Sequence, residues 1–229
     1  EETAQYMTHP ERCIVTGNPV RKEFEIADRK EARKALKLNP ECKMVLSFGG
    51  SLGAKTINDA VAKLIIHYAN NPNFYFYHIT GRSSYEEFID LLKEANIDLA
   101  ELSNAVVQEY ANNMPELLHA ADLVLARSGA MTIAEINYVG IAAIYSPYPF
   151  AANDHQMKNA IASERSGASV TIPDDQLSGE LLIDTVRELF ADTEKLRNMA
   201  QHSKSLAIRN AAELICAEAE KLLTPDAED

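Results

Sequence analysis

Cysteine is scarce in this sequence, and its few cysteines form no pattern that could build a disulfide framework or a metal site. Cys13, Cys42 and Cys216 are far apart, and none belongs to a Cys-x-x-Cys pair. Domains held by disulfides carry many closely spaced cysteines, and structural zinc sites need paired ligands. The histidines show no ligand spacing either. We therefore predict incidental or buried thiols in a reducing compartment, and no bound metal.

Positive charge and long hydrophobic runs are also in short supply. The chain has 22 Lys and Arg against 34 Asp and Glu, a formal net charge of -12. Generic nucleic-acid binding needs a basic face, so we expect no nucleic-acid partner, and an anionic ligand must be held by local donors. No run reaches the length of a membrane span, and the acidic start is not a signal peptide. Because residue 1 is glutamate, we expect a fragment or a processed chain.

What the sequence does contain is a regular alternation of apolar strand patterns and amphipathic helix patterns. With 46% hydrophobic and 24% charged residues, its composition is that of an ordinary globular protein. Apolar strands alternating with helices predict an α/β fold, a Rossmann-like parallel sheet with helices on both faces. Strands are predicted at 13–16, 44–48, 74–79, 105–108, 123–126, 142–145 and 169–172. Helices are predicted at 54–68, 85–95, 114–120, 131–138, 154–165 and 181–190, with two more in 193–223 separated by a bend at 208–210.

Two of these strands run directly into glycine-containing turns that open helices. The loop 49–54 follows the first, and the segment 127–132 follows the second, with Glu135 one turn into the next helix. A helix N-terminus carries unpaired N–H groups and a partial positive charge, so each junction is a candidate phosphate site. A carboxylate just beyond such a site suits ribose hydroxyls. The pattern predicts a bound nucleoside diphosphate.

The first junction matches no standard phosphate-binding motif. Ser51 stands where the dinucleotide fingerprint needs its second glycine. The P-loop pattern nearly fits, with Ala54 in place of the second glycine before Lys55 and Thr56. The loop 49–54 could also be only a turn that lets a helix pack tightly on its strand.

The second junction is more informative because Arg127 ends an apolar strand. A charged residue at such a place is unusual unless it is paired or faces a ligand. A P-loop ATPase would instead want a strand ending in aspartate. The structural alternative is a salt bridge of Arg127 at the sheet edge, for example with Glu135. We favour the ligand-facing interpretation.

Taken in order, four motifs resemble a known family. They are GNPVR at 17–21, FGGSLGA at 48–54, EYANNMPELLHAADLVLARSGAMTIAE at 109–135 and NDHQMKNA at 153–160. Together they resemble the C-terminal half of the MurG family, bacterial transferases that convert lipid I to lipid II with UDP-N-acetylglucosamine (UDP-GlcNAc). The resemblance covers nearly the whole chain and implies the C-terminal, donor-binding domain of a GT-B glycosyltransferase.

The resemblance also implies a donor site for UDP-GlcNAc that needs neither cofactor nor metal. Contacts to the diphosphate are implied for Arg21, Gly50, Ser51, Gly53, Ala130, Met131 and Thr132. Contacts to the ribose and uracil are implied for Glu135, Tyr110, Ala111 and Met114. Contacts to the sugar are implied for His155 and Gln156, with Asn159 nearby. Arg127, Ser128 and Gly129 would form the loop beside the nucleotide.

In domain terms, the resemblance implies that this chain holds one half of the enzyme. Residues 1–17 would be a remnant of the N-terminal acceptor domain, 18–207 the donor domain, and 208–229 a helix that packs on the other half, plus a tail. That other half would supply the lipid I site, the general base and the membrane contact. The full-length enzyme would be cytoplasmic and peripheral on the inner face of the membrane, and this fragment alone inactive.

Three alternatives stay open at this point. One is a different GT-B enzyme of UDP-sugars, such as an epimerase or another transferase. A second is a P-loop-like NTPase, and a third is a non-catalytic nucleotide-binding module.

Overall fold

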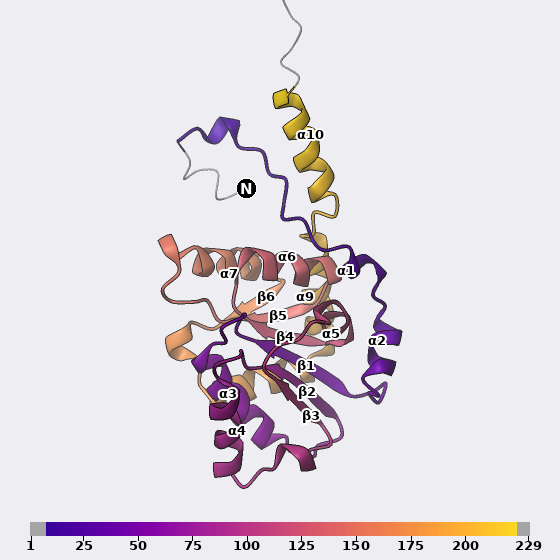
Figure 1. The fold of residues 1–229 in the computed structure, drawn as a ribbon, viewed down its shortest axis with the longest axis vertical. Coiled ribbons are helices and arrows are strands. Elements are labelled where there is room, and N and C mark those ends of the chain that lie inside the picture. The colour runs from indigo at the N-terminus through magenta and orange to yellow at the C-terminus, as the bar shows by residue number, and fades with distance from the viewer. Residues whose placement is uncertain (1–7, 224–229) are drawn as a thin grey trace, which may run out of the picture.

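The computed structural model describes residues 8–223, which fold around one parallel six-stranded sheet (Figure 1). The strand order is β3-β2-β1-β4-β5-β6. Every neighbouring pair is parallel, which confirms the predicted α/β class. The strands are β1 (Lys43–Phe48), β2 (Phe74–Ile79), β3 (Ala105–Gln108), β4 (Leu123–Ala126), β5 (Ala142–Tyr145) and β6 (Ser169–Thr171).

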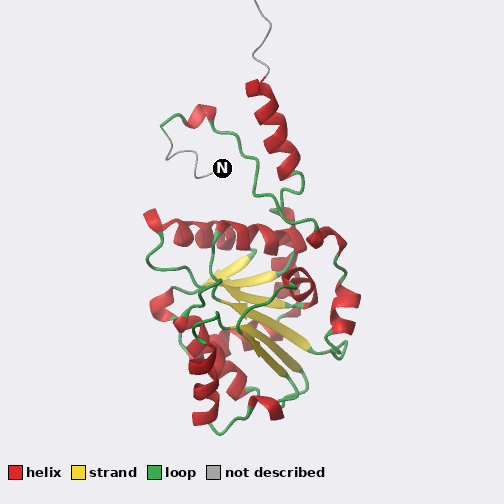
Figure 2. Cartoon of the chain, in the orientation of Figure 1, coloured by secondary structure: helices red, strands yellow, loops and turns green. Residues whose placement is uncertain are grey.

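Helices cover both faces of this sheet, as Figure 2 shows. One core contains Val45 of β1 and Leu125 of β4 and is closed by α3, α4 and α8, whereas Leu46 and Val124 face the other core under α2, α5 and α6. Successive strand residues point to opposite faces, so strands buried on both faces must be apolar throughout. The helices are α1 (Glu23–Ile26), α2 (Arg29–Ala35), α3 (Lys55–His67), α4 (Tyr85–Glu94), α5 (Met114–Ala120), α6 (Ala130–Val139), α7 (His155–Arg165), α8 (Gly179–Ala191), α9 (Thr193–Ser205) and α10 (Ala211–Leu223).

The strand order places a topological switch between β1 and β4. The chain runs outward from β1 to β3 and then returns to lay β4 on the other side of β1. Phe48 at the end of β1 is aligned with Ala126 at the end of β4. In open parallel sheets, ligands bind in the crevice outside the carboxyl ends of the strands at such a reversal. The two glycine-containing junctions follow these two strands.

The structure differs from the sequence prediction at the N-terminal side. The strand predicted at 13–16 is wrong: these residues pair with no strand, and Ile14 is 62% exposed. An apolar run becomes a strand only where a neighbour completes its hydrogen bonds, and this segment lies away from the sheet (Figure 1). The short helices α1 and α2 were not predicted. Asp28 caps α2 by accepting hydrogen bonds from the N–H groups of Lys30 and Glu31.

The C-terminal segment behaves as predicted, with two helices separated by a bend. α9 packs on the body, whereas α10 projects from it (Figure 1) and buries only Ala211. Ile215 is 41% exposed and Leu222 is 85% exposed, so nothing within residues 8–223 covers the apolar stripe of α10. Within residues 8–223, no helix has both the length and the hydrophobicity that a membrane crossing requires.

Candidate functional site

The site lies at the carboxyl edge of the sheet, where the two glycine-containing junctions stand side by side. α3 begins after Ala54 and α6 begins after Gly129, and neither helix end is capped by a side-chain hydrogen bond. The N–H groups of the first turn of each helix are therefore available to an acceptor. Since β1 and β4 are hydrogen-bonded neighbours, both helix ends open on the same crevice.

The loop after β1 owes its shape to glycines in left-handed conformations. Gly50 has φ +93° and Gly53 has φ +81°, and the N–H of Gly53 donates to the carbonyl of Gly50 over 3.0 Å. Gly53 packs directly on the backbone of Thr80, so closely that a Cβ at this position would stand 2.1 Å from the Thr80 oxygen. The turn holds Ser51 exposed at its tip, where the resemblance placed a phosphate contact.

A buried polar network supports this loop from behind. Asn58 Nδ2 donates to the carbonyl of Thr80 over 3.1 Å, so Asn58 Oδ1 accepts from His78 Nε2 over 3.2 Å. His78 Nδ1 in turn accepts from the hydroxyl of Ser47 over 2.8 Å. Burial lowers the pKa of His78 to about 3, so the imidazole is neutral. The network links β1, β2 and α3, and its last acceptor is the carbonyl against which Gly53 packs.

We expect His78 to make the protein less stable in mild acid. Its pKa is about 3 when folded and 6.5 in a model peptide, so the unfolded chain binds the proton first. The contribution of the neutral His78 to the free energy of unfolding is complete above pH 6.5 and is lost as the pH falls from 6.5 towards 3. At pH 5 the loss is about 2 kcal/mol. Urea unfolding of wild type and His78→Gln between pH 7.5 and 5 measures it, and His67→Gln, which removes an exposed histidine, is the control. Equal pH slopes in all three proteins would contradict the assignment.

Glu135, the predicted ribose ligand, is paired with Arg21, the predicted phosphate ligand. Arg21 Nη2 lies 3.5 Å from Glu135 Oε1, and the Glu135 side chain is 18% exposed. Burial raises the pKa of Glu135, and the charge of Arg21 opposes that shift. The structure therefore brings together two residues that are far apart in the sequence. The alternative of a salt bridge for Arg127 is confirmed, but its partner is Asp174 and not Glu135.

Arg127 is held by other partners and faces inward along the edge. Its Nη1 lies 2.5 Å from Asp174 Oδ1 and donates to the carbonyls of Ser146 and Pro147 over 2.9 and 3.0 Å. Its guanidinium also stands over the ring of Tyr148, 5.8 Å from the centroid. These contacts fix the loop after β5, and a direct contact of Arg127 with a ligand stays a prediction. The sequence reasoning missed Asp174, although its place just after a strand end was a usable signal.

α7 brings the predicted sugar-binding residues to the same edge. Ser128 Oγ donates to the carbonyl of Gln156 over 2.8 Å, and Asn159 Nδ2 donates to the carbonyl of Ser128 over 3.1 Å. Gln156 Oε1 accepts the N–H of Tyr148 over 3.0 Å. His155 is exposed, with Nδ1 2.8 Å from the carbonyl of Ala152. Gln156 and Asn159 thus lock α7 to the loop before α6, and His155 remains at the surface of the edge.

The predicted uracil loop follows β3, further along the same edge. Tyr110 is 48% exposed and Ala111 is buried, while Met114 begins α5. The guanidinium of Arg82, which the sequence reasoning did not single out, stands 5.3 Å from the centroid of the Tyr110 ring. A half-exposed aromatic ring with a cation beside it suits stacking of a base.

The side chains after the first junction do not fit a P-loop. Lys55 Nζ pairs with Glu87 at 2.5 Å and with Asp59 at 3.2 Å on the exposed side of α3. The Thr56 hydroxyl donates to Asp174. In a P-loop both groups would be directed at the phosphates and magnesium. Among residues 8–223, no group of three or more metal-ligating side chains comes together.

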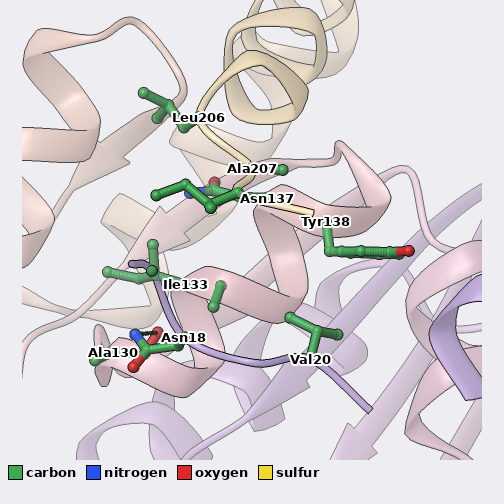
Figure 3. Close-up of a pocket in the computed structure, with 11 residues that line it drawn as sticks. Asn18, Val20, Ala130, Ile133, Asn137, Tyr138, Leu206 and Ala207 are labelled. Carbon is green, nitrogen blue, oxygen red and sulfur yellow. Dashed lines mark hydrogen bonds between the residues drawn. The ribbon is translucent and has the colours of Figure 1, made fainter. Parts of the chain in front are cut away.

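A small cavity of about 140 Å³ lies on the other side of α6 (Figure 3). It is bounded by the segment after Gly17, the body of α6 and the link from α9 to α10. The side-chain amide of Asn18 donates to the carbonyl of Ala130 over 3.5 Å. Arg209 Nη2 donates to the carbonyl of Tyr138 over 2.9 Å at the other end of α6. The helix that opens on the crevice is thus held by both segments that lead away from the domain.

Comparison with known proteins identifies the family to which this architecture belongs. The family model described as the glycosyltransferase family 28 C-terminal domain matches residues 44–215. The chain belongs to this family. The family 28 match includes both junctions, Glu135 and the first turn of α7, and confirms the C-terminal domain of a GT-B glycosyltransferase.

Curated and solved relatives agree with family 28 membership. A transferase from Desulforamulus reducens, named UDP-N-acetylglucosamine–N-acetylmuramyl-(pentapeptide) pyrophosphoryl-undecaprenol N-acetylglucosamine transferase, is 40% identical over 97% of this chain and 60% of its own length. MurG from Acinetobacter baumannii is similar with a TM-score of 0.71 and 25% identity, covering 88% of this chain and 55% of that one. A UDP-GlcNAc 2-epimerase from Neisseria meningitidis, at 17% identity and a TM-score of 0.66 over 96% of this chain and 58% of its own, shares the fold. The chain spans about 60% of the length of the curated relatives it matches.

Proposed function

We propose that this chain is the donor-binding domain of an inverting glycosyltransferase that moves N-acetylglucosamine from UDP-GlcNAc to lipid I, forming lipid II in peptidoglycan synthesis. The observation that carries the proposal is the pair of uncapped helix ends at the β1–β4 switch, with Glu135 one turn into α6. The names of the related transferases supply the donor and the acceptor.

In the proposed site, the helix ends carry the negative charge of the donor. The N–H groups of Ala130, Met131 and Thr132, with Ser51 and Arg21, would hold the diphosphate. Fixed donors aimed at the phosphates stabilise the charge that develops as UDP leaves, and they need no metal to do so.

The remaining donor contacts are proposed from the same edge of the sheet. Glu135 would accept hydrogen bonds from the ribose hydroxyls. The loop of Tyr110, Ala111 and Met114 would hold uracil. His155 and Gln156 at α7 would reach the sugar hydroxyls.

The acceptor side of the reaction is proposed to lie in the other domain of the full-length enzyme. That domain would bind lipid I, supply the general base that deprotonates the attacking muramyl hydroxyl, and meet the inner face of the bacterial membrane. Residues up to 17 would be a remnant of that domain, and the helix within 208–223 would pack on it; residues 1–7 and the tail 224–229 lie outside the part of the chain that the structure describes. The uncovered apolar stripe of α10, with Ile215 and Leu222 exposed, supports that assignment.

Calorimetric titration of this chain with UDP-GlcNAc tests the proposal. We expect saturable, metal-independent binding that is stronger than binding of UDP-glucose, ATP with magnesium, or NAD. We also expect no glycosylation of lipid I by the chain alone, since the acceptor site and base lie elsewhere. Binding of ATP with magnesium instead of UDP-GlcNAc would favour an NTPase, and sugar transfer by the chain alone would refute the division of labour. Epimerisation of UDP-GlcNAc by the full-length protein would point to the epimerases that share this fold.

A further inference from the structure

One carboxylate, that of Asp174, joins several of the elements that build the edge of the sheet. Asp174 opens the short helix η5 (Asp174–Gln176) after β6, and its side chain is 16% exposed. Its Oδ1 lies 2.5 Å from Arg127 Nη1, and its Oδ2 accepts from Thr56 Oγ1 over 3.0 Å. Thr56 lies in the first turn of α3, and Arg127 precedes the loop that opens α6. A single side chain therefore bridges both junctions.

Arg127 extends this bridge to the third helix end. The same Nη1 that pairs with Asp174 donates to the carbonyls of residues 146 and 147. The next residue, Tyr148, donates its N–H to Gln156 Oε1 in the first turn of α7. Through Arg127, the position of the Asp174 carboxylate thus bears on the N-termini of α3, α6 and α7 together.

The ion pair of Arg127 and Asp174 also fixes the position of one positive charge at the carboxyl edge of the sheet. Arg127 is 12% exposed, and Asp174 neutralises it inside the wall of the site. Removing one partner of such a pair leaves an uncompensated charge in a poorly solvated place. Without Asp174, we expect the guanidinium to leave the carbonyls of residues 146 and 147, so that the loop after β5 and the first turn of α7 lose their fixed position.

We infer that Asp174 is a positioning residue for donor binding, which sets the spacing of the three helix ends without touching the ligand. This inference rests on the proposed function, because the quantity that Asp174 adjusts is the fit of a diphosphate and its sugar. Asp174 belongs to none of the four motifs in the sequence, and its hydrogen bond and ion pair are the observations that assign it this role.

The test is Asp174→Asn, which keeps the size and the hydrogen-bond acceptor but removes the charge. Calorimetry measures the affinities for UDP-GlcNAc and UDP, and NMR titration measures that for uridine. We expect the affinities for UDP-GlcNAc and UDP to fall on the order of tenfold, as for other residues that support binding groups from behind. Uridine has no phosphate, so its affinity should not change. The matched control, Asp184→Asn, removes an exposed ion pair with Arg187 on α8 and should change nothing.

The outcomes separate the positioning role from the proposed function. If the unmodified chain does not bind UDP-GlcNAc, the proposed function fails and this inference fails with it. If the unmodified chain binds and folded Asp174→Asn binds equally well, only the positioning role is overturned. An equal loss for all three ligands means general damage and overturns it too. Should Asp174→Asn not fold, Thr56→Val removes one hydrogen bond, and we expect UDP to bind about two- to tenfold more weakly. Unchanged UDP affinity in that variant refutes the role.

Discussion

Replacing Glu135 with alanine is expected to weaken binding of UDP-GlcNAc by about 10- to 150-fold, the range for lost hydrogen bonds to a charged group. Glu135 sits on the first turns of α6, mostly buried, where a ribose below the helix end could donate both hydroxyls to one carboxylate. The substitution also removes the ion-pair partner of Arg21, and this change does not replace the lost hydrogen bonds to the ribose. Calorimetric titration of the two proteins measures the effect.

The pH dependence of binding distinguishes the carboxylate from a merely structural residue. Because burial raises the pKa of Glu135, the side chain protonates at a higher pH than an exposed glutamate. Affinity should therefore be complete at neutral pH and fall as the pH drops through that raised pKa. Glu135→Gln should bind weakly at every pH and show a flatter profile. A wild-type affinity that does not change with pH, with Gln as good as Glu, would refute the ribose role.

Replacing Gly53 with alanine is expected to destabilise the fold by roughly 2 to 5 kcal/mol and to abolish donor binding. The left-handed φ costs about 1–2 kcal/mol for a residue with a Cβ. The clash adds about 1–3 kcal/mol, because the Cβ would stand 2.1 Å from the Thr80 oxygen, which the buried network of Asn58 holds in place. Urea unfolding measures the loss.

Gly50→Ala is the matched control for that variant. Gly50 also has a left-handed φ, +93°, but a Cβ there meets nothing within 4 Å. It should therefore cost only the conformational strain, about 1–2 kcal/mol. If the two variants were equally stable, the contact of Gly53 with Thr80 would have no energetic weight. Far-UV circular dichroism of both shows whether they keep the fold.

The sheet was predictable from the sequence because its strands are buried on both faces. Runs such as 123–126 carry no polar residue, and a run of that kind between helix patterns has few alternatives. The strand predicted at 13–16 did not form for a reason outside the run itself: its hydrogen bonds need a neighbouring strand, and the described part of the chain places none beside it. The local sequence pattern shows that a segment is able to form a strand, but whether the strand forms depends on a neighbouring strand that completes its hydrogen bonds.

The candidate site was predictable where it depends on backbone shape, and less so where it depends on side chains that meet in space. Loops 49–54 and 127–132 are recognisable in the sequence because glycine and other small residues follow a strand pattern there. The ion pair of Arg127 was foreseen as a possibility, but with Glu135, because those two are near in sequence. Its real partner, Asp174, comes from two strands further along, and a pairing across loops leaves no periodic trace.

The crossing of the chain at Gly17 and Ile208 has a consequence for how such proteins can be recombined. A Cβ on Gly17 would lie 2.8 Å from that of Ile208, so the peptide that enters the body and the one that leaves it touch at a single point. A domain whose two chain ends are adjacent can be exchanged between proteins by cutting the chain at two neighbouring points, and no other connection has to be cut or rejoined. Residues 18–207 therefore form an exchangeable unit. To graft them onto the acceptor half of a different enzyme, only the two adjacent junctions near Gly17 and Ile208 have to be matched.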